Sequence, residues 1–281
     1  MPELPEVEIT ARRLDAALRG VEVESVVAPG VNALRSFDPP LSALEGRAIA
    51  GVRRRGKLFL IDFAGDLTML VHLMSAGRLQ LFDKRAGPRD RTSRLLVRLP
   101  EDRELRLREF GTKQAAWVKL LPTEAVFDDE MLATMGPEAW PDPPPFDELV
   151  AGARPLHSLL RDQRVIAGIG RSWVDEILWH AKLSPFKRGD DLSLEEAQEL
   201  RAETVATLGA AIDHYERVID LPIPDKLPMP LQVHRKQGEP CPRCGTKLEA
   251  VFYEDYVMTY CPAEQTEGRV LKDRRLSRLL K

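Results

Sequence analysis

The chain has 281 residues, of which 43% are hydrophobic, and a formal net charge of −3. This length and composition suffice for one large domain or two ordinary ones. No apolar run is long enough to form a membrane-spanning helix, and the acidic start MPELPEVEIT lacks the apolar segment of a signal peptide. Three cysteines, an odd number, argue against a disulfide framework. We therefore expect a cytoplasmic protein that does not enter the membrane.

The first 120 residues predict one helix followed by many short strands. Residues 2–20 favour a helix, because Pro5 is tolerated near a helix start and Gly20 is a typical stop. Residues 21–120 then contain short β-type runs, and residues 104–110 alternate apolar with polar side chains. This pattern predicts an antiparallel β-sandwich or barrel.

Changes in composition divide the rest of the chain. Residues 122–147 are rich in proline and acid, which indicates an interdomain linker or, alternatively, a long surface loop inside one domain. Residues 148–218 have apolar side chains at helical spacing. The expected α+β organisation is a β-sandwich domain with an N-terminal helix over 1–121, a linker over 122–147, a helical domain over 148–230, and a finger-like β-hairpin with a basic tail over 231–281.

Basic residues gather in four clusters although the net charge is slightly negative. Each cluster alone is typical of a solvated face, but their recurrence beside glycine turns favours contacts with phosphate. The clusters are Arg53–Arg55 with Lys57, residues 103–108, Arg235 with Lys236, and the C-terminal KDRRLSRLLK.

The N-terminus carries a distinctive amine once Met1 is removed, as aminopeptidases do before a small residue. Pro2 then has a free secondary α-amine, which titrates at about pH 8 and is partly unprotonated at neutral pH. Attack of this amine on a sugar C1′ yields an iminium cation, an electron sink for β-elimination. Glu3 and Glu6 can share a helix face and supply protons there. A capped first helix explains the same residues equally well.

Three further features combine charge with a turn or a ring. Lys57 follows a glycine turn, where it can hold a phosphate or donate a proton, or be a solvated turn residue. Arg108 and Phe110 share one side of a strand, which suits the gap left by an extruded base or an ordinary surface Arg and core Phe. Gly170 ends a glycine turn before a helix, whose amides can bind phosphate, and Arg171 adds charge.

The C-terminal segment has the spacing of a zinc ribbon. Cys241 and Cys244 form a CxxC pair that is followed by Cys261 after sixteen residues. The fourth ligand is expected at position 264, where Glu264 can ligate zinc, and His234 is an alternative nitrogen ligand. We expect one structural zinc ion or, alternatively, a hairpin held by hydrophobic packing alone.

The order of these motifs resembles that of the formamidopyrimidine-DNA glycosylase/endonuclease VIII family over essentially the whole chain. The motifs in chain order are PELPEVE, RRRGK, REFG, GIG and GEPCPRCGT. The resemblance implies an N-terminal β-sandwich, a helix–two-turn–helix domain and a zinc finger, with DNA bound between domains. It also implies base excision followed by β,δ-elimination at the abasic site. It further implies a monomeric, nucleoid-associated protein whose partner is double-stranded DNA with damaged bases or abasic sites.

The resemblance assigns roles residue by residue. Pro2 is the nucleophile, Glu3 the main acid/base, Glu6 a supporting carboxylate and Lys57 the hairpin lysine that contacts DNA. The implied zinc ligands are Cys241, Cys244, Cys261 and Glu264, the last of which replaces a cysteine of the family pattern. The implied DNA-binding residues are His72, Met74, Ser75, Arg108, Phe110, Gly170, Arg171 and Tyr256.

Several positions depart from the family pattern. Ser75 falls at the position of a methionine wedge, with Met74 one residue earlier. Arg171 replaces an amide side chain that touches phosphate, and Tyr256 replaces a DNA-contacting arginine, where it can stack or hydrogen-bond. Residues 220–230 lack the Gly-Gly-Thr-like loop that many relatives fold over oxidised guanine, so the damaged base is left open. The alternatives are a damaged-DNA-binding relative with little or no catalysis, and an unrelated zinc-ribbon interaction protein.

Overall fold

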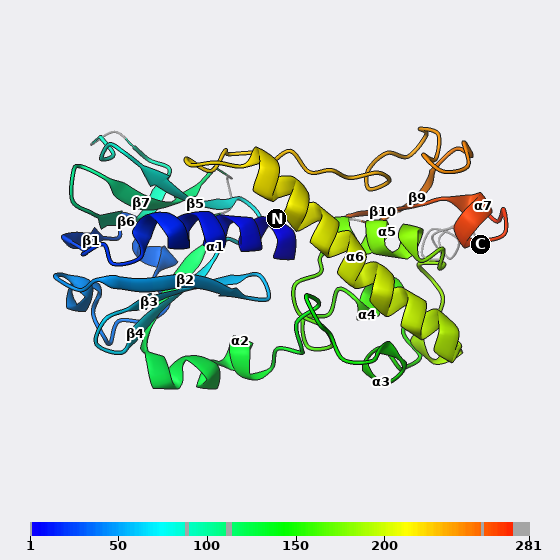
Figure 1. The fold of residues 1–281 in the computed structure, drawn as a ribbon, viewed down its shortest axis with the longest axis horizontal. Coiled ribbons are helices and arrows are strands. Elements are labelled where there is room, and N and C mark those ends of the chain that lie inside the picture. The colour runs from blue at the N-terminus through cyan, green and yellow to red at the C-terminus, as the bar shows by residue number, and fades with distance from the viewer. Residues whose placement is uncertain (1, 88–89, 111–113, 254–255, 272–281) are drawn as a thin grey trace, which may run out of the picture. The chain divides into compact units, whose positions relative to one another are not determined.

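The computed structural model describes residues 2–271 apart from 88–89, 111–113 and 254–255 (Figure 1). By internal contacts the chain forms two compact units. The first consists of Met1–Thr134 and Ile212–Pro228, and the second of Met135–Ala211 and Met229–Lys281. One boundary between them falls within a single long helix, α6 (Leu194–Val218).

The first unit begins with α1 (Leu4–Leu18), which follows the N-cap residue Glu3. Pro5 fits the first turn because the N–H it lacks has no partner inside a helix. The apolar face of α1 contributes Val7, Leu14 and Leu18 to the core of the unit. The predicted N-terminal helix is therefore confirmed.

Two four-stranded antiparallel sheets follow, with strand orders β1-β6-β7-β5 and β2-β3-β4-β8. Side chains from both sheets and from α1 share one hydrophobic core, as in a β-sandwich. This confirms the predicted α+β class with an antiparallel sandwich. The strands are β1 (Ser25–Val27), β2 (Ile49–Arg55), β3 (Leu58–Phe63), β4 (Leu67–His72), β5 (Gly77–Phe82), β6 (Ser93–Arg98), β7 (Glu104–Glu109) and β8 (Trp117–Pro122).

Short helical turns connect and close the sandwich. The proline- and acid-rich segment after β8 is partly ordered into such turns, and Asp129 caps α2 by accepting the N–H of Met131. These elements are η1 (Val31–Ala33), η2 (Leu41–Leu44), η3 (Thr123–Asp128) and α2 (Glu130–Ala133).

The second unit is helical and ends in a β-hairpin. Its elements are α3 (Phe146–Leu149), α4 (Leu156–Leu159), α5 (Arg171–His180), η4 (Gly189–Asp191), most of α6, β9 (Glu249–Phe252), β10 (Val257–Tyr260) and α7 (Pro262–Gln265). β9 and β10 pair in antiparallel register, so the predicted hairpin is confirmed.

One helical prediction was wrong beyond its first turn. The apolar spacing of residues 157–165 favours a helix, but α4 ends at Leu159. Asp162 instead binds the backbone N–H of Arg164, and the side chain of Gln163 bonds Gly168 N–H and Ile169 C=O. These side chains offer the backbone an alternative to helical hydrogen bonds.

Among the described residues, no helix is both long and apolar enough to cross a membrane.

Candidate active site and nucleic-acid interface

Two carboxylates meet at the start of α1. The Glu3 side chain accepts a backbone N–H at the third helical residue, and Glu6 Oε2 accepts the N–H of Glu3 at 2.8 Å. This capping box confirms the structural interpretation of the PELPE segment. Both side chains are buried, with 2% and 3% exposed, and Glu3 directly follows the half-buried Pro2. Structural and chemical interpretations of these residues are therefore compatible.

The second oxygen of Glu6 has a partner that the sequence analysis missed. The Tyr215 hydroxyl, on α6, donates to Glu6 Oε1 at 2.7 Å. Burial raises the pKa of Tyr215, and the negative charge of Glu6 raises it further, so the phenol keeps its proton and acts as the donor. A tyrosine 209 positions away in a helix carries no motif that would have identified it.

Lys57 lies in the turn between β2 and β3, where Gly56 has a φ of 56°. The alternative of a solvated turn residue was wrong, because Lys57 is only 8% exposed. An ion pair of 2.6 Å between Arg54 and Glu8 ties this end of β2 to the first half of α1. The lysine and the two carboxylates are thus held by one pair of packed elements.

His72 and the following turn lie beside this lysine. Burial, aided by the positive charge of Lys57, lowers the pKa of His72 to about 4, so the ring is neutral at physiological pH. His72 stacks on Trp117 at 5.6 Å and its Nδ1 accepts the N–H of Met74 at 2.9 Å. Met74 has a φ of 48° and is half-buried, whereas Ser75 is exposed at the tip.

Arg108 and Phe110 lie together as predicted. The guanidinium carbon of Arg108 is 4.5 Å from the centroid of the Phe110 ring, and Phe110 is 44% exposed. The alternative of a core phenylalanine was therefore wrong. Arg108 Nη1 also lies 3.1 Å from Gln80 Oε1 and 3.4 Å from Asp225 Oδ1.

Asp225 belongs to the proline-rich segment after α6, residues 220–230, which we call the strap. Gln80 Nε2 donates to Asp225 Oδ1 at 3.0 Å and also to the carbonyl of Ile223. Arg78 Nε donates to the backbone carbonyl of Asp225. The strap is therefore bonded to the β5–β7 face through side chains that the sequence analysis did not connect with it.

In the second unit, Gly170 is the N-cap of α5 and Arg171 its first residue. Tyr256 stacks on Tyr253 at 4.3 Å between centroids. The guanidinium carbons of Arg161 and Arg171 lie 4.3 and 5.1 Å from the Tyr256 ring centroid. Tyr256 thus holds two positive charges by cation–π contact at the start of a helix, a setting suited to phosphate.

A buried carboxylate supports this cluster. Asp175 Oδ2 lies 2.6 Å from His234 Nδ1 and accepts the N–H of Thr259 at 3.0 Å. His157, which stacks on Tyr256, places its Nε2 3.3 Å from the other Asp175 oxygen. His234 is not part of the group of metal-binding candidates, which consists of Cys241, Cys244, Cys261 and Glu264.

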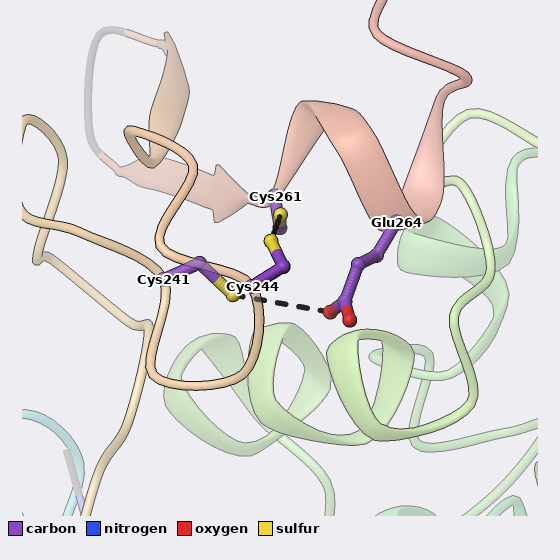
Figure 2. A group of neighbouring side chains, drawn as sticks. All are labelled: Cys241, Cys244, Cys261 and Glu264. Atoms are coloured by element: carbon purple, nitrogen blue, oxygen red, sulfur yellow. Dashed lines mark hydrogen bonds between the residues drawn. The ribbon is translucent and has the colours of Figure 1, made fainter.

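The three cysteines and Glu264 converge as the spacing predicted (Figure 2). Their ligand atoms lie within 4.8 Å of one another, with Cys244 Sγ and Cys261 Sγ 3.5 Å apart. Thiolates are the soft donors that zinc prefers, and a carboxylate can complete its tetrahedron. The cluster fits one structural zinc ion, with Glu264 as the fourth ligand.

Arg243, inside the CxxC pair, orients that fourth ligand. Its Nε and Nη2 lie 2.8 and 2.7 Å from Glu264 Oε2. The same guanidinium donates to the carbonyls of Trp179 and His180 at the end of α5, and stacks on the Trp179 ring. Trp179 Nε1 in turn donates to Cys241 Sγ at 3.4 Å. Outer contacts of this kind orient metal ligands and tune the site.

The predicted basic clusters are only partly available for phosphate. Arg53 pairs with Asp62 at 2.6 Å, and Arg106 pairs with Glu104 at 2.7 Å. Arg54 forms an ion pair with Glu8 of α1. The cluster KDRRLSRLLK lies outside the described residues.

An antiparallel sandwich with a helix at its N-terminus, a helical unit and a Cys3Glu hairpin together form the architecture of the helix–two-turn–helix DNA glycosylases. The sequence model of the formamidopyrimidine-DNA glycosylase N-terminal domain matches residues 1–112. That of the formamidopyrimidine-DNA glycosylase H2TH domain matches residues 142–221. The chain belongs to the formamidopyrimidine-DNA glycosylase family.

Relatives and solved structures agree with this assignment. The chain is 33% identical to a formamidopyrimidine-DNA glycosylase of Pediococcus pentosaceus, covering 93% of this chain and 98% of that one. It is 35% identical to that of Moorella thermoacetica, covering 89% and 94%. The fold is similar to that of the Lactococcus lactis enzyme in complex with abasic-site DNA, with a TM-score of 0.83, 27% identity, and 94% and 99% coverage.

Proposed function

We propose that this protein is a base-excision-repair DNA glycosylase that also acts as a lyase at the resulting abasic site. The observation that carries the proposal is a pair of buried carboxylates, Glu3 and Glu6, within the first helical turn after Pro2. A merely structural N-cap is commonly a short Ser, Thr, Asp or Asn. The family membership supports the same chemistry.

The Pro2 nitrogen, freed of Met1, attacks C1′ of the damaged nucleotide. The C1′–base bond breaks, its electron pair leaves with the base, and the base takes up a proton. Ring opening then gives an iminium between Pro2 and C1′. Loss of a C2′ proton expels the 3′ phosphate, and a second elimination expels the 5′ phosphate. Glu3 is the proposed acid and base for these proton transfers.

Lys57 and the β4–β5 turn are the proposed contacts near the reacting nucleotide. Lys57 pairs with a phosphate, while Met74 and Ser75 enter the duplex and His72 fixes the backbone between them. Arg108 with Phe110 fills the gap that the extruded base leaves. These assignments rest on the family pattern and on the placement of all these residues in one unit.

The second unit is proposed to hold the DNA backbone. Gly170 presents the helix N-terminus to a phosphate, and Arg171 and Arg161 add charge from their positions on Tyr256. In domain terms, we propose a catalytic domain over 1–121, a linker over 122–147, a helix–two-turn–helix domain over 148–230 and a zinc-finger hairpin over 231–281. The proposed partner is double-stranded DNA with oxidised bases or abasic sites, bound by a monomer.

Borohydride trapping tests the proposal, because it reduces an iminium to a stable amine. Wild-type protein with abasic-site DNA should give a covalent adduct. Pro2→Gly, which replaces the secondary amine by a primary one, should give less adduct, and a variant with a retained N-terminal extension should give none. Arg53→Ala, which breaks a surface ion pair with Asp62, is the control and should trap normally. DNA binding by the wild type without any adduct would contradict the proposal.

A second candidate function is recognition of damaged DNA with little catalysis. The exposed Ser75 at the tip of the β4–β5 turn favours it, because serine fills less space in a base stack than methionine. The trapping experiment separates the two functions, since a binder that lacks catalysis forms no adduct. A panel of oxidised purines and pyrimidines then identifies the excised base.

A further inference from the structure

Tyr215 is a buried residue of the first unit with no role in the proposed chemistry described so far. It is fully buried near the end of α6, and its hydroxyl reaches Glu6 Oε1 at 2.7 Å. Glu6 is on α1, so this bond joins two helices that are far apart in sequence. A buried phenol that donates a hydrogen bond to a carboxylate forms a strong, charge-assisted contact.

Glu6 connects Tyr215 with the N-terminal end of the chain. Its other oxygen, Oε2, accepts the backbone N–H of Glu3 at 2.8 Å. The carboxylate is thus held at both oxygens, by Tyr215 on one side and by the peptide that follows Pro2 on the other. The hydrogen bonds form a continuous path from α6 to the residue next to the nucleophile.

We infer that Tyr215 is a positioning residue, which holds Glu6 in one orientation and thereby aims the Pro2 nitrogen at C1′. The inference rests on the proposed function of Pro2. The proline ring fixes rotation about its N–Cα bond, so once the Pro2–Glu3 peptide plane is held, only rotation about the Cα–C bond of Pro2 still moves the nitrogen. That plane is set by the Glu3 N–H bond to Glu6, and Tyr215 keeps Glu6 in place to accept it.

The contact between the helices does not depend on Tyr215 alone. Arg13, on α1, donates to the carbonyl of Ile219 at 2.8 Å and to Glu216 Oε1 at 2.7 Å. Removing one hydroxyl should therefore leave α1 docked on the end of α6. The variant Tyr215→Phe therefore tests whether the hydroxyl orients the Pro2 nitrogen, and not whether the protein folds.

The experiment measures single-turnover borohydride trapping on abasic-site DNA at saturating protein. Tyr215→Phe should slow trapping roughly ten-fold, in line with the loss of one hydrogen bond to a charged group. Its DNA dissociation constant should stay within about two-fold of wild type, because Tyr215 is fully buried. Tyr260→Phe is the matched control: Tyr260 is also fully buried and its hydroxyl accepts the N–H of Leu271 at 2.7 Å. It should trap at the wild-type rate.

A double-mutant cycle shows whether Tyr215 acts through Glu6. In a Glu6→Gln background, adding Tyr215→Phe should change the trapping rate by less than about two-fold. A full ten-fold effect in that background would overturn the inference, as would a normal rate for Tyr215→Phe when the wild type traps. Absence of trapping by the wild type would overturn the proposed function and this inference together.

A second variant covers the case in which Tyr215→Phe does not fold. Glu6→Asp retains the charge and Tyr215 but withdraws the carboxylate from both donors. Folded Glu6→Asp should also trap about ten-fold more slowly. A normal rate for this variant would overturn the inference independently.

Discussion

His72 shows how one side chain links stability to pH. Its pKa in the fold is about 4, below the ordinary value for histidine, so protonation favours the unfolded chain. The stability that the neutral ring contributes is complete above pH 6.5 or so and is lost as pH falls toward 4. We expect wild-type protein to lose about 2 kcal/mol through this group between pH 7.5 and 5.

Urea denaturation at the two pH values measures this loss. His72→Asn, which has no titrating ring, should lose less stability over the same interval by about that amount. The comparison cancels the carboxylates that titrate in both proteins. Equal losses in both would show that His72 is not held neutral.

Arg243 is a residue whose effect should appear in metal retention. It fixes Glu264, stacks on Trp179 and bonds the end of α5. Arg243→Ala should release zinc to a chromophoric chelator at least about ten-fold faster, as loss of an outer contact typically weakens a metal site. Arg269→Ala, which breaks an exposed pair with Glu267, is the control. Equal release rates would contradict a positioning role for Arg243.

Residue roles were predictable where a residue type and its spacing were themselves the signal. The metal-binding role of the CxxC pair, Cys261 and Glu264 was predicted from their spacing alone, and the structure brings the four residues together. Tyr215 and Asp225 had no such signal, because their partners are on other elements and depend on how helices and strands pack. His234 was a reasonable metal candidate by type, but the group of potential ligands that the fold brings together does not include it.

At the scale of elements, periodicity predicted most helices and strands because apolar spacing reflects which face meets the core. It was less successful at 157–165, where Asp162 and Gln163 bind the backbone and end the helix early. It also missed the η3 and α2 turns of the segment after β8. Short turns of this kind depend on local side-chain bonds that periodicity does not detect.

We expect the side chain of Asp225 to contribute to the order of the strap. Asp225 binds Gln80 and Arg108 through its side chain. Asp225→Ala should speed amide hydrogen exchange over residues 221–230 by about five- to ten-fold, since two hydrogen bonds are lost. Asp220→Ala, at a side chain that is 96% exposed, is the control. Unchanged exchange in Asp225→Ala would show that the prolines and Ile223 order the strap by themselves.

For the whole molecule, we expect the local placement of charge, rather than the net charge, to govern DNA affinity. The formal charge is −3, yet we propose that Lys57, Arg161 and Arg171 each contact a phosphate. Three phosphate contacts give a slope of about −2.7 in log affinity against log salt, or roughly 40-fold weaker binding at 200 mM than at 50 mM. Filter binding or fluorescence anisotropy on abasic-site DNA measures this.

Two variants connect the slope with particular residues. Arg171→Ala should reduce it by about 1, whereas Arg53→Ala should leave it unchanged because Asp62 already neutralises Arg53. A flat salt response in the wild type would mean that these side chains do not contact phosphate.

The buried carboxylate of Asp175 links helix α5 to the C-terminal segment of the second unit. It is one of two adjacent acids on α5 that collect donors from the C-terminal segment, since Glu176 accepts the N–H groups of Gln232, Val233 and His234. If either acid lost these donors, a buried carboxylate would remain without compensation, which would strongly destabilise the fold. The finger and α5 should therefore open as one cooperative block, and chelating the zinc should raise exchange along the helix as well as in the hairpin.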